Sequence, residues 1–251
     1  MSGHSKWHSI KHKKGAADAK RGKIFTKHAK LIEIATREGG ESNPDNNPSL
    51  RTAIDSAKAD NVPNANIDRA IKKGSGELKG EAQTVEVSYE AFGPGGVAMI
   101  IECLTDNKNR TLPNIKNVIS KIGGRFADTG SVSWMFEQKG VVVARSSAPR
   151  DGDELELQLI DAGAEDIDID DDIIEVKTSK ENWAKVRDAL KNIGCEIETA
   201  GLKFVPTQET NISDLSTAKK LMECTDALEE DDDVSEVHTN ANVSDEIAKQ
   251  L

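Results

Sequence analysis

The chain has 251 residues, with 33 Lys+Arg against 44 Asp+Glu and a formal net charge of −11. That length predicts two or three domains, and the 36% of hydrophobic residues predicts that their cores are small. No apolar run approaches the roughly 20 residues of a membrane span, and no apolar segment follows the basic N-terminus, so we expect neither a membrane protein nor a secretory signal. Cys103, Cys195 and Cys224 stand far apart, which argues against disulfides and paired-Cys zinc sites and indicates a reducing, cytoplasmic setting.

The charge is spread unevenly along the chain. Residues 1–80 carry 16 Lys+Arg and 9 Asp+Glu, a net of +7, whereas residues 81–251 carry 17 and 35, a net of −18. Residues 1–30 alone hold nine basic residues against one acid, Asp18, and four of the five histidines. Such asymmetry predicts that the basic arm binds a polyanion while the body is repelled by it; a disordered, solubilising tail is the alternative.

Helical periodicity organises the first part of the chain. Residues 1–16 show no period and are expected to form an extended arm. From about Ala17 to Gly39, apolar residues recur at helical spacing, with a row of lysines on the flank of that stripe. Asn47 is expected to cap a second helix, with Pro48 at its first position, and a short third helix follows Pro63. Together these elements predict a helical bundle that ends near residue 80.

The period then changes to two. Residues 84–104 predict a hairpin around a glycine-rich turn, followed by a helix at 112–122 and strands at 132–137 and 141–145 with a turn between them. Residues 141–199 show the order strand, helix, strand, strand, helix, strand, which is the split βαββαβ unit. The strand, helix and strand that remain, over 202–238, cannot bury both faces of a sheet alone, so we pair them with 84–136.

The predicted fold class is therefore α+β. We expect an N-terminal helical bundle followed by two α+β domains, the last a ferredoxin-like βαββαβ unit inserted into a discontinuous middle domain. The expected divisions are a basic arm and helical domain, a discontinuous α+β domain, an inserted ferredoxin-like domain and a C-terminal tail, at 1–80, 81–137 plus 201–240, 138–200 and 241–251. The glycine-rich link at 74–80 predicts motion between domains.

The arm SGHSKWHSIKHKK is the most informative segment. Its lysines can replace condensed counterions on phosphates with little sequence preference. Trp7 is suited to stacking on an unpaired base, unless it folds back onto the bundle, and the histidines can contact phosphates or base edges. The candidate nucleic-acid-binding residues are Lys6, Trp7, His8, Lys11, His12, Lys13, Lys14, Lys20, Arg21, Lys23 and Lys27.

Two patterns resemble metal sites without completing one. His4, His8 and His12 recur every four residues, but no carboxylate or thiolate completes a ligand shell. The aspartates of 166–172 and the acids of 229–233 lack the calcium-loop glycine and terminal glutamate, so we interpret them as an acidic strand face and a solvated turn. We expect no metal and no cofactor. No nucleophile elbow and no Cys–His pair is present, so we do not expect an enzyme.

Other motifs allow ordinary structural interpretations. Residues 105–111 precede a helix and could meet a phosphate there, but a cap with an exposed loop explains them as well and is favoured. Trp134 and Trp183 lie at apolar positions of an expected strand and helix, so both are expected in the core.

Several segments resemble one known family closely. They are MSGHSKWHSIKHKKGAADAKRGKIFTKHAK, VPNANIDRAIKKG, YEAFGPGGVAMIIECLTDNKNRT and DTGSVSWMF, with AGAED and DALEEDDDVSEVHTNA later in the chain. They are similar to the YebC/PmpR family over essentially the whole length; position 2 is Ser where Ala is commoner. The resemblance implies a helical domain and two α+β domains, the third inserted into the second. It also implies a cytoplasmic transcriptional regulator that binds DNA.

Mitochondrial relatives in that family are translational activators, and bacterial members are linked to the ribosome. The resemblance thus implies DNA as the first partner and ribosomal RNA as the alternative. A long loop at 41–48 and helices joined through proline predict no short helix-turn-helix, and a body of net charge −18 would repel a duplex wrapped around it. An arm threading structured RNA fits these features better. Both targets stay open here, as does the oligomeric state.

Overall fold

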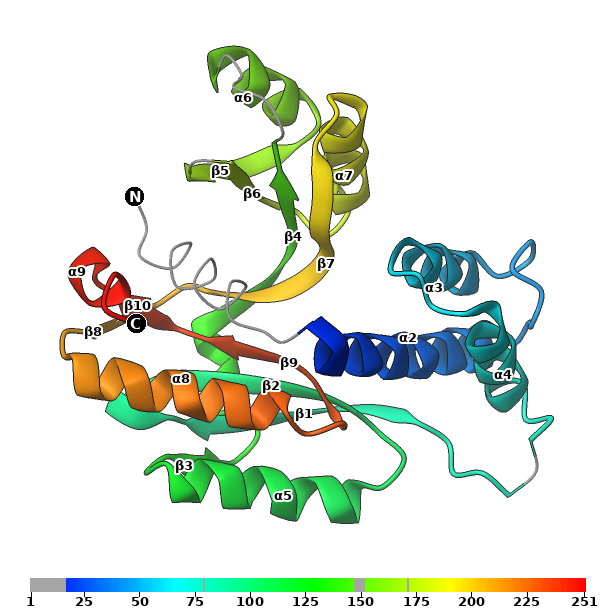
Figure 1. Cartoon of the computed structure of the whole chain (residues 1–251), viewed down its shortest axis with the longest axis horizontal. Helices are drawn as coiled ribbons and strands as arrows, with labels where there is room; N and C mark the ends of the chain where they lie inside the picture. Colours follow the sequence, from blue (N-terminus) through cyan, green and yellow to red (C-terminus); the bar gives the residue numbers. More distant parts are fainter. Residues whose placement is uncertain (1–16, 79, 147–151, 171) are drawn as a thin grey trace.

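The computed structural model describes residues 17–78, 80–146, 152–170 and 172–251. A unit of helices lies beside two antiparallel four-stranded sheets, each with its own helices (Figure 1). The predicted α+β class is confirmed. The division into domains at the borders given above stays a prediction.

The helical unit consists of α2 (Ala17–Gly39), α3 (Pro48–Ala59) and α4 (Asn64–Gly74). The Asn47 side chain accepts a hydrogen bond from the Leu50 backbone nitrogen at 3.0 Å, which caps α3 as expected. The three helices share a core that includes Ile32, Leu50 and Ile67. A Cβ on Gly74 would lie 2.4 Å from the Glu33 carbonyl oxygen, so only glycine lets the end of α4 approach α2 this closely.

A short link joins α3 to α4. It comprises only residues 60–63, and Asn61 within it has a φ of 59°, the left-handed conformation that such a tight turn needs. The link contains no glycine and ends in Pro63, and the longer loop between α2 and α3 also ends in a proline, Pro48, which opens α3. The absence of a helix-turn-helix with a short glycine turn stays a prediction.

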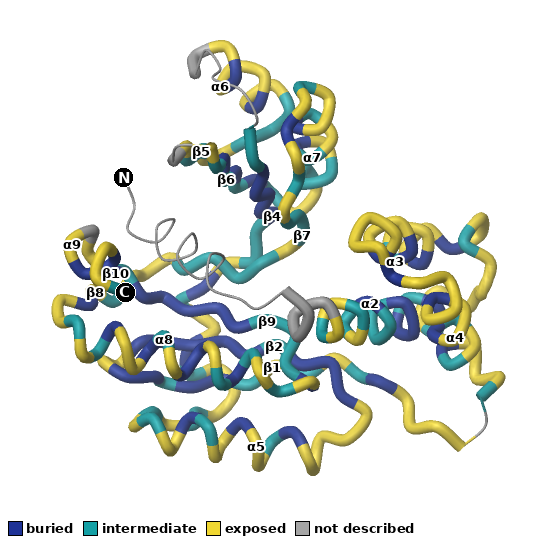
Figure 2. Tube along the Cα trace, viewed as in Figure 1, coloured by how far each residue is buried: buried dark blue, intermediate teal, exposed yellow. Residues whose placement is uncertain are grey.

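The first sheet has the order β3-β1-β2-β9 and is antiparallel throughout. Its strands are β1 (Val85–Phe92), β2 (Ala98–Thr105), β3 (Arg125–Ala127) and β9 (Val234–Thr239). Helices α5 (Lys108–Lys121) and α8 (Leu215–Glu229) share a core with one face, where Met99 and Ile101 of β2 meet Ile115 of α5 and Leu221 of α8. Figure 2 shows this region as the most continuously buried part of the chain.

The second sheet has the order β5-β6-β4-β7. Its strands are β4 (Phe136–Arg145), β5 (Ala164–Asp170), β6 (Ile173–Thr178) and β7 (Glu196–Pro206), and helices α6 (Gly152–Asp161) and α7 (Trp183–Asn192) are interleaved with them. The chain order of these elements is that of a βαββαβ unit. Their core, which includes Val142, Leu159, Val176 and Leu190, forms between the helices and one face of the sheet.

The expected turn at 138–140 does not exist. Strand β4 runs straight through it and pairs with β7 along its whole length. Gly140 is required for close packing: a Cβ there would lie 2.5 Å from the Cβ of Trp183 and 2.9 Å from the Thr178 methyl group. The strand also starts later than expected, because Ser133–Met135 form a 3₁₀ turn, η2.

Residues 241–251 are not a tail outside the domains. Strand β10 (Ala241–Val243) pairs in parallel with β8 (Thr210–Ile212), and the short helix α9 (Asp245–Ala248) follows. Val243 and Ile247 are buried in the core of the first sheet. The prediction of a tail was wrong because three alternating residues and one helical turn are too short for a clear period.

Candidate nucleic-acid interface

The predicted binding residues divide into those that the structure describes and those that it does not. Lys6, Trp7, His8, Lys11, His12, Lys13 and Lys14 lie outside the described residues. Lys20 and Arg21 belong to α2, but their side chains are outside the described set as well. Lys23 and Lys27 are described in full, and both point at the body of the protein.

Both of these lysines donate to backbone oxygens of the segment around α8 and β9. Lys23 Nζ donates to the Glu229 carbonyl at 3.0 Å, and Lys27 Nζ donates to the Ser235 carbonyl at 3.1 Å. Glu229 is the last residue of α8, where unpaired carbonyls carry a partial negative charge, so an ammonium group is favourable there. The basic flank of α2 therefore binds the helical unit to the first sheet.

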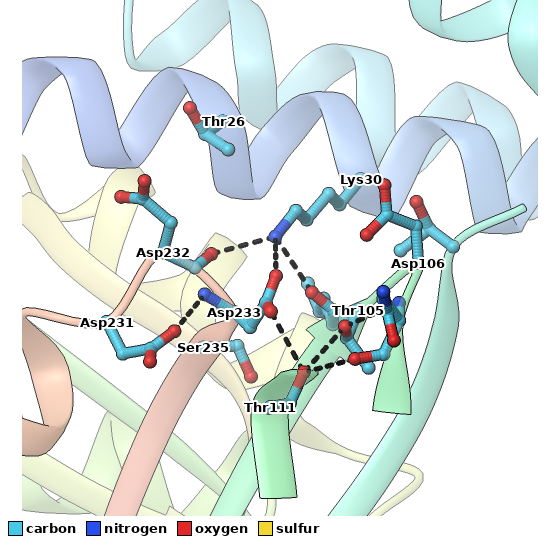
Figure 3. Close-up of polar contacts among 12 residues, drawn as sticks. Thr26, Lys30, Thr105, Asp106, Thr111, Asp231, Asp232, Asp233 and Ser235 are labelled. Carbon is cyan, nitrogen blue, oxygen red and sulfur yellow. Dashed lines mark hydrogen bonds and ion pairs between the residues drawn. The ribbon is translucent and has the colours of Figure 1, made fainter. Parts of the chain in front are cut away.

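Lys30 continues the same row and enters a buried polar cluster (Figure 3). Its ammonium group donates to the carbonyls of Leu104 and Asp232, both at 2.8 Å, and lies 3.1 Å from Asp233 Oδ1. The other carboxylate oxygen of Asp233 accepts from Arg110 Nη2 at 2.6 Å and from the Thr111 hydroxyl at 2.9 Å. Three elements, α2, α5 and the loop before β9, thus meet on one carboxylate.

Asp233 is only 3% exposed, although a solvated turn was expected at 229–233. That expectation was wrong at this residue. Burial by itself raises the pKa of Asp233, but hydrogen bonds from Arg110, Lys30 and Thr111 outweigh it, so the pKa lies below its ordinary value. The carboxylate is charged at neutral pH and is fully surrounded by donors.

The segment 105–111 belongs to this cluster and does not form a free anion site. The Asn107 side chain accepts from the Arg110 backbone nitrogen at 3.1 Å and caps α5, so the favoured cap interpretation is confirmed. Thr105 and Thr111 are fully buried, however, so the segment is not simply an exposed loop. Its Arg110 and Thr111 side chains donate to Asp233.

Basic side chains on α4 are oriented differently. The Arg69 side chain is 74% exposed and contacts Glu81 at 3.2 Å, and Lys72 is exposed one turn further along. A groove of about 530 Å³ lies between α2 and α4, and Arg69 lines it together with Phe25 and Asn66. The sequence analysis did not include Arg69 and Lys72 among the candidate binding residues. Their helical spacing, opposite the buried Ile67, could have indicated an exposed basic face.

A second charged cluster lies between the two sheets. Glu236 of β9 pairs with Lys203 of β7 at 3.0 Å, and His238 Nε2 lies 2.7 Å from Glu102. Burial raises the pKa of Glu236, but Lys203, His238 and Lys27 outweigh it, so the pKa falls below the usual range. Glu102, Glu236 and His238 hold possible ligand atoms within 4.8 Å of one another, yet each already has an ionic or hydrogen-bonding partner. The predicted absence of a metal stays a prediction.

Trp134 is exposed rather than in the core as expected. Trp134 belongs to the 3₁₀ turn η2 and is 59% exposed. Its indole nitrogen donates a hydrogen bond to the Ser131 carbonyl at 3.0 Å. Glu90 fixes this turn, because its carboxylate accepts from the Val132 backbone nitrogen at 2.6 Å and from that of Gly130 at 2.8 Å. The expectation failed because the residue is in a turn, not a strand. Trp183 is half-buried.

The described helices give no sign of a membrane span. Within residues 17–78, 80–146, 152–170 and 172–251, none combines the length and apolar character that a span requires.

The helical unit, bound through lysines to a body of two antiparallel sheets, makes this an α+β protein. Comparisons with known proteins identify its family. Residues 5–77 match the model of the TACO1/YebC protein N-terminal domain, and residues 84–241 match that of the TACO1/YebC second and third domain. The chain therefore belongs to the TACO1/YebC family, as the resemblance to YebC/PmpR proteins implied.

Curated relatives span the whole chain. A protein of Petrotoga mobilis is 49% identical over 100% of this chain and 98% of its own length, and one of Halothermothrix orenii is 46% identical over 100% and 99%. Each is named a probable transcriptional regulatory protein. The crystal structure of a conserved hypothetical protein from Aquifex aeolicus has a TM-score of 0.82 and 41% identity, over 92% of this chain and 93% of that one.

Proposed function

We propose that this protein is a cytoplasmic, nucleic-acid-binding regulator of gene expression, and that it binds its target through the basic segment 1–21. The observation that carries the proposal is the charge distribution, with nine basic residues and one acid in residues 1–30 against a net of −18 in residues 81–251. The names of the relatives support a regulatory role. We propose no catalytic role.

Within the basic region, we assign the phosphate contacts to a subset of the predicted residues. Lys23 and Lys27 donate to backbone carbonyls of the body, which leaves them poorly placed for a second partner. The proposed contacts are therefore made by Lys6, Lys11, Lys13, Lys14, Lys20 and Arg21, with Trp7 and the histidines His8 and His12 against bases or phosphates.

Duplex DNA is the first target that we propose. The relatives are named for transcription, and a segment rich in lysine and arginine can neutralise the phosphates of a duplex without reading its sequence. Ribosomal RNA, bound by a ribosome-associated translation factor, is the second. It is favoured by the acidic body, which repels a duplex that wraps it, because binding through the basic segment alone suits structured RNA.

Replacing Lys11, Lys13 and Lys14 together with alanine tests the proposal. Loss of three phosphate contacts should weaken binding about tenfold or more at low salt, and by the same factor for unrelated sequences. The matched control replaces Lys180, Lys185 and Lys191, three exposed lysines of the acidic body, and should bind as the wild type does. Equal affinity of the arm variant and the wild type, measured by fluorescence anisotropy, would end the proposal.

The two targets are separated by co-sedimentation with ribosomal subunits, with and without nuclease. Nuclease-sensitive co-sedimentation that the arm variant loses would favour the RNA alternative. Absence of the protein from the subunit fractions, together with binding of duplex DNA in the anisotropy experiment, would favour DNA.

A further inference from the structure

The groove between α2 and α4 has the size of a small-ligand site and is lined mostly by polar residues. Its volume of about 530 Å³ falls within the ~300–1,000 Å³ typical of such sites. It begins at Gly22, directly after the segment proposed to bind nucleic acid. Phe25 and Ala29 of α2 and Ala70 of α4 supply apolar surface, and Phe25 is only half-buried. The groove therefore offers an aromatic ring at the point where the basic segment joins the folded unit.

The carboxylates that line the groove are already paired. Glu33 accepts from the Thr84 hydroxyl at 2.6 Å and from Lys73 Nζ at 3.0 Å. Asp106 accepts from Arg110 at 3.0 Å. These bonds compensate both negative charges, so neither would strongly repel an anion that entered.

Arg69 is the lining cation best placed to bind a new anion. Lys30 and Lys73, which also line the groove, are held by Asp233 and Glu33. Arg69 is mostly exposed, and its contact with Glu81 is a surface pair of the kind that contributes little stability. Exchanging Glu81 for a phosphate therefore costs little. Asn66, exposed one turn earlier on α4, adds an amide that can donate to or accept from a base edge.

We propose that this groove binds one unpaired nucleotide of the strand held by the basic segment, with the base against Phe25 and the phosphate on Arg69. A ring for stacking beside a cation for the backbone is the usual composition of single-strand sites. A paired base offers the ring no free face, so a closed duplex would not use the groove. The inference rests on the proposed function, and it holds for RNA and for locally opened DNA alike.

Three variants test the assignment against fluorescein-labelled oligouridine, oligothymidine and a short DNA duplex. Phe25→Leu keeps an apolar side chain but removes the ring, and should weaken binding of the single strands about fivefold or more. Arg69→Ala should weaken it several-fold and make the log–log salt slope shallower by about 0.7. Phe25→Tyr, which keeps an aromatic ring, should bind the single strands as tightly as the wild type does. All three should bind the duplex within about twofold of the wild type.

Arg51→Ala is the matched control for Arg69→Ala. Arg51 is an exposed arginine of α3 that donates to the Pro44 and Asp45 carbonyls and does not line the groove. It should leave single-strand affinity unchanged. Wild-type single-strand affinity in both Phe25→Leu and Arg69→Ala, or equal losses on strand and duplex, would overturn the inference while leaving the role of the basic segment intact. Failure of the wild type to bind any of the three probes would overturn both.

Cross-linking supplies a readout that does not depend on the folding of a variant. Trypsin can cleave after Lys23 and Lys27, which isolates residues 24–27 with Phe25 in one peptide. Ultraviolet irradiation of the wild type with 4-thiouridine-labelled RNA should add mass to this peptide, and an excess of unlabelled strand should remove the signal. Cross-links confined to other peptides would contradict the inference, and would leave the groove to a different partner such as a peptide.

Discussion

Two neighbouring helices carry rows of basic side chains in different surroundings. On α2, Lys23, Lys27 and Lys30 all donate to backbone oxygens of the body, and Lys30 also pairs with a buried carboxylate. On α4, Arg69 and Lys72 point outward. The two rows have similar charge and similar spacing. Their difference teaches that the number of cations on a helix does not identify a nucleic-acid surface. What matters is whether their partners are part of the folded body, as for Lys30, or an exposed carboxylate that can be exchanged, as for Arg69.

The row on α2 joins the helical unit to the first sheet. Lys23 donates to the Glu229 carbonyl at the end of α8, Lys27 to the Ser235 carbonyl in β9, and Lys30 to carbonyls of β2 and of the loop before β9. Hydrogen bonds from a charged donor are stronger than those between neutral groups. Relative motion of these two parts, expected from the glycine-rich link at 74–80, is therefore opposed by contacts that the link itself does not reveal.

Asp233→Asn should have the largest effect on stability. The amide would place an NH₂ group among Lys30, Arg110 and Thr111, all of which donate to the carboxylate. We expect a loss of about 2–4 kcal/mol in the free energy of unfolding, measured with urea. Asp232→Asn is the control, because Asp232 is exposed and only its backbone oxygen enters the cluster. Equal stability of the two variants would show that the cluster does not hold the units together.

The stability difference between the wild type and Asp233→Asn should depend on pH. The pKa of Asp233 lies below its ordinary value in the folded protein, so its stabilising contribution is present above the unfolded value of about 3.9 and disappears as the pH falls through the lower, folded value. The stability difference between wild type and Asp233→Asn should be constant above about pH 5 and shrink below pH 4. A difference that grows on acidification would contradict the assignment.

Replacing one lysine in each row with methionine compares directly how much the two rows contribute to stability. Lys30→Met removes the donor to two carbonyls and to Asp233, and should cost about 1–3 kcal/mol of stability. Lys72→Met removes an exposed charge, and should change stability by less than about 0.5 kcal/mol. Thermal melting of the two variants measures both. Equal melting temperatures would mean that the two rows do not differ.

Local patterns made the secondary structure predictable in large part. The asparagine at 47 followed by proline predicted the start of α3, and the row of apolar residues after Ala17 predicted α2, whose end at Gly39 was also expected. Gly140 shows the limit of such patterns. A glycine in a run of polar residues predicts a turn, but its function here is to let β4 approach the Trp183 side chain of α7, a contact distant in sequence.

For the candidate site, the sequence allowed us to predict the basic residues but not the groups that they contact. The basic flank of α2 could be recognised, because Lys23, Lys27 and Lys30 fall on one side of the helix. Their partners could not, because Glu229, Asp233 and Ser235 lie some two hundred residues away and contribute mainly carbonyls, which any sequence supplies. The same long-range contacts bury Asp233 in a stretch that looks like a solvated turn.

The salt dependence of binding tests most directly the claim that the segment 1–21 contacts the nucleic acid while Lys23 and Lys27 do not. Six phosphate contacts predict a log–log slope of about −5 on duplex DNA and about −4 on single strands, and the further contact proposed for Arg69 would bring the single-strand slope to about −5. Replacing Lys11, Lys13 and Lys14 with alanine should make the duplex slope shallower by about two to three units, whereas replacing Lys23 and Lys27 with methionine should leave it unchanged. A slope unaffected by the first variant and reduced by about two units in the second would contradict the account.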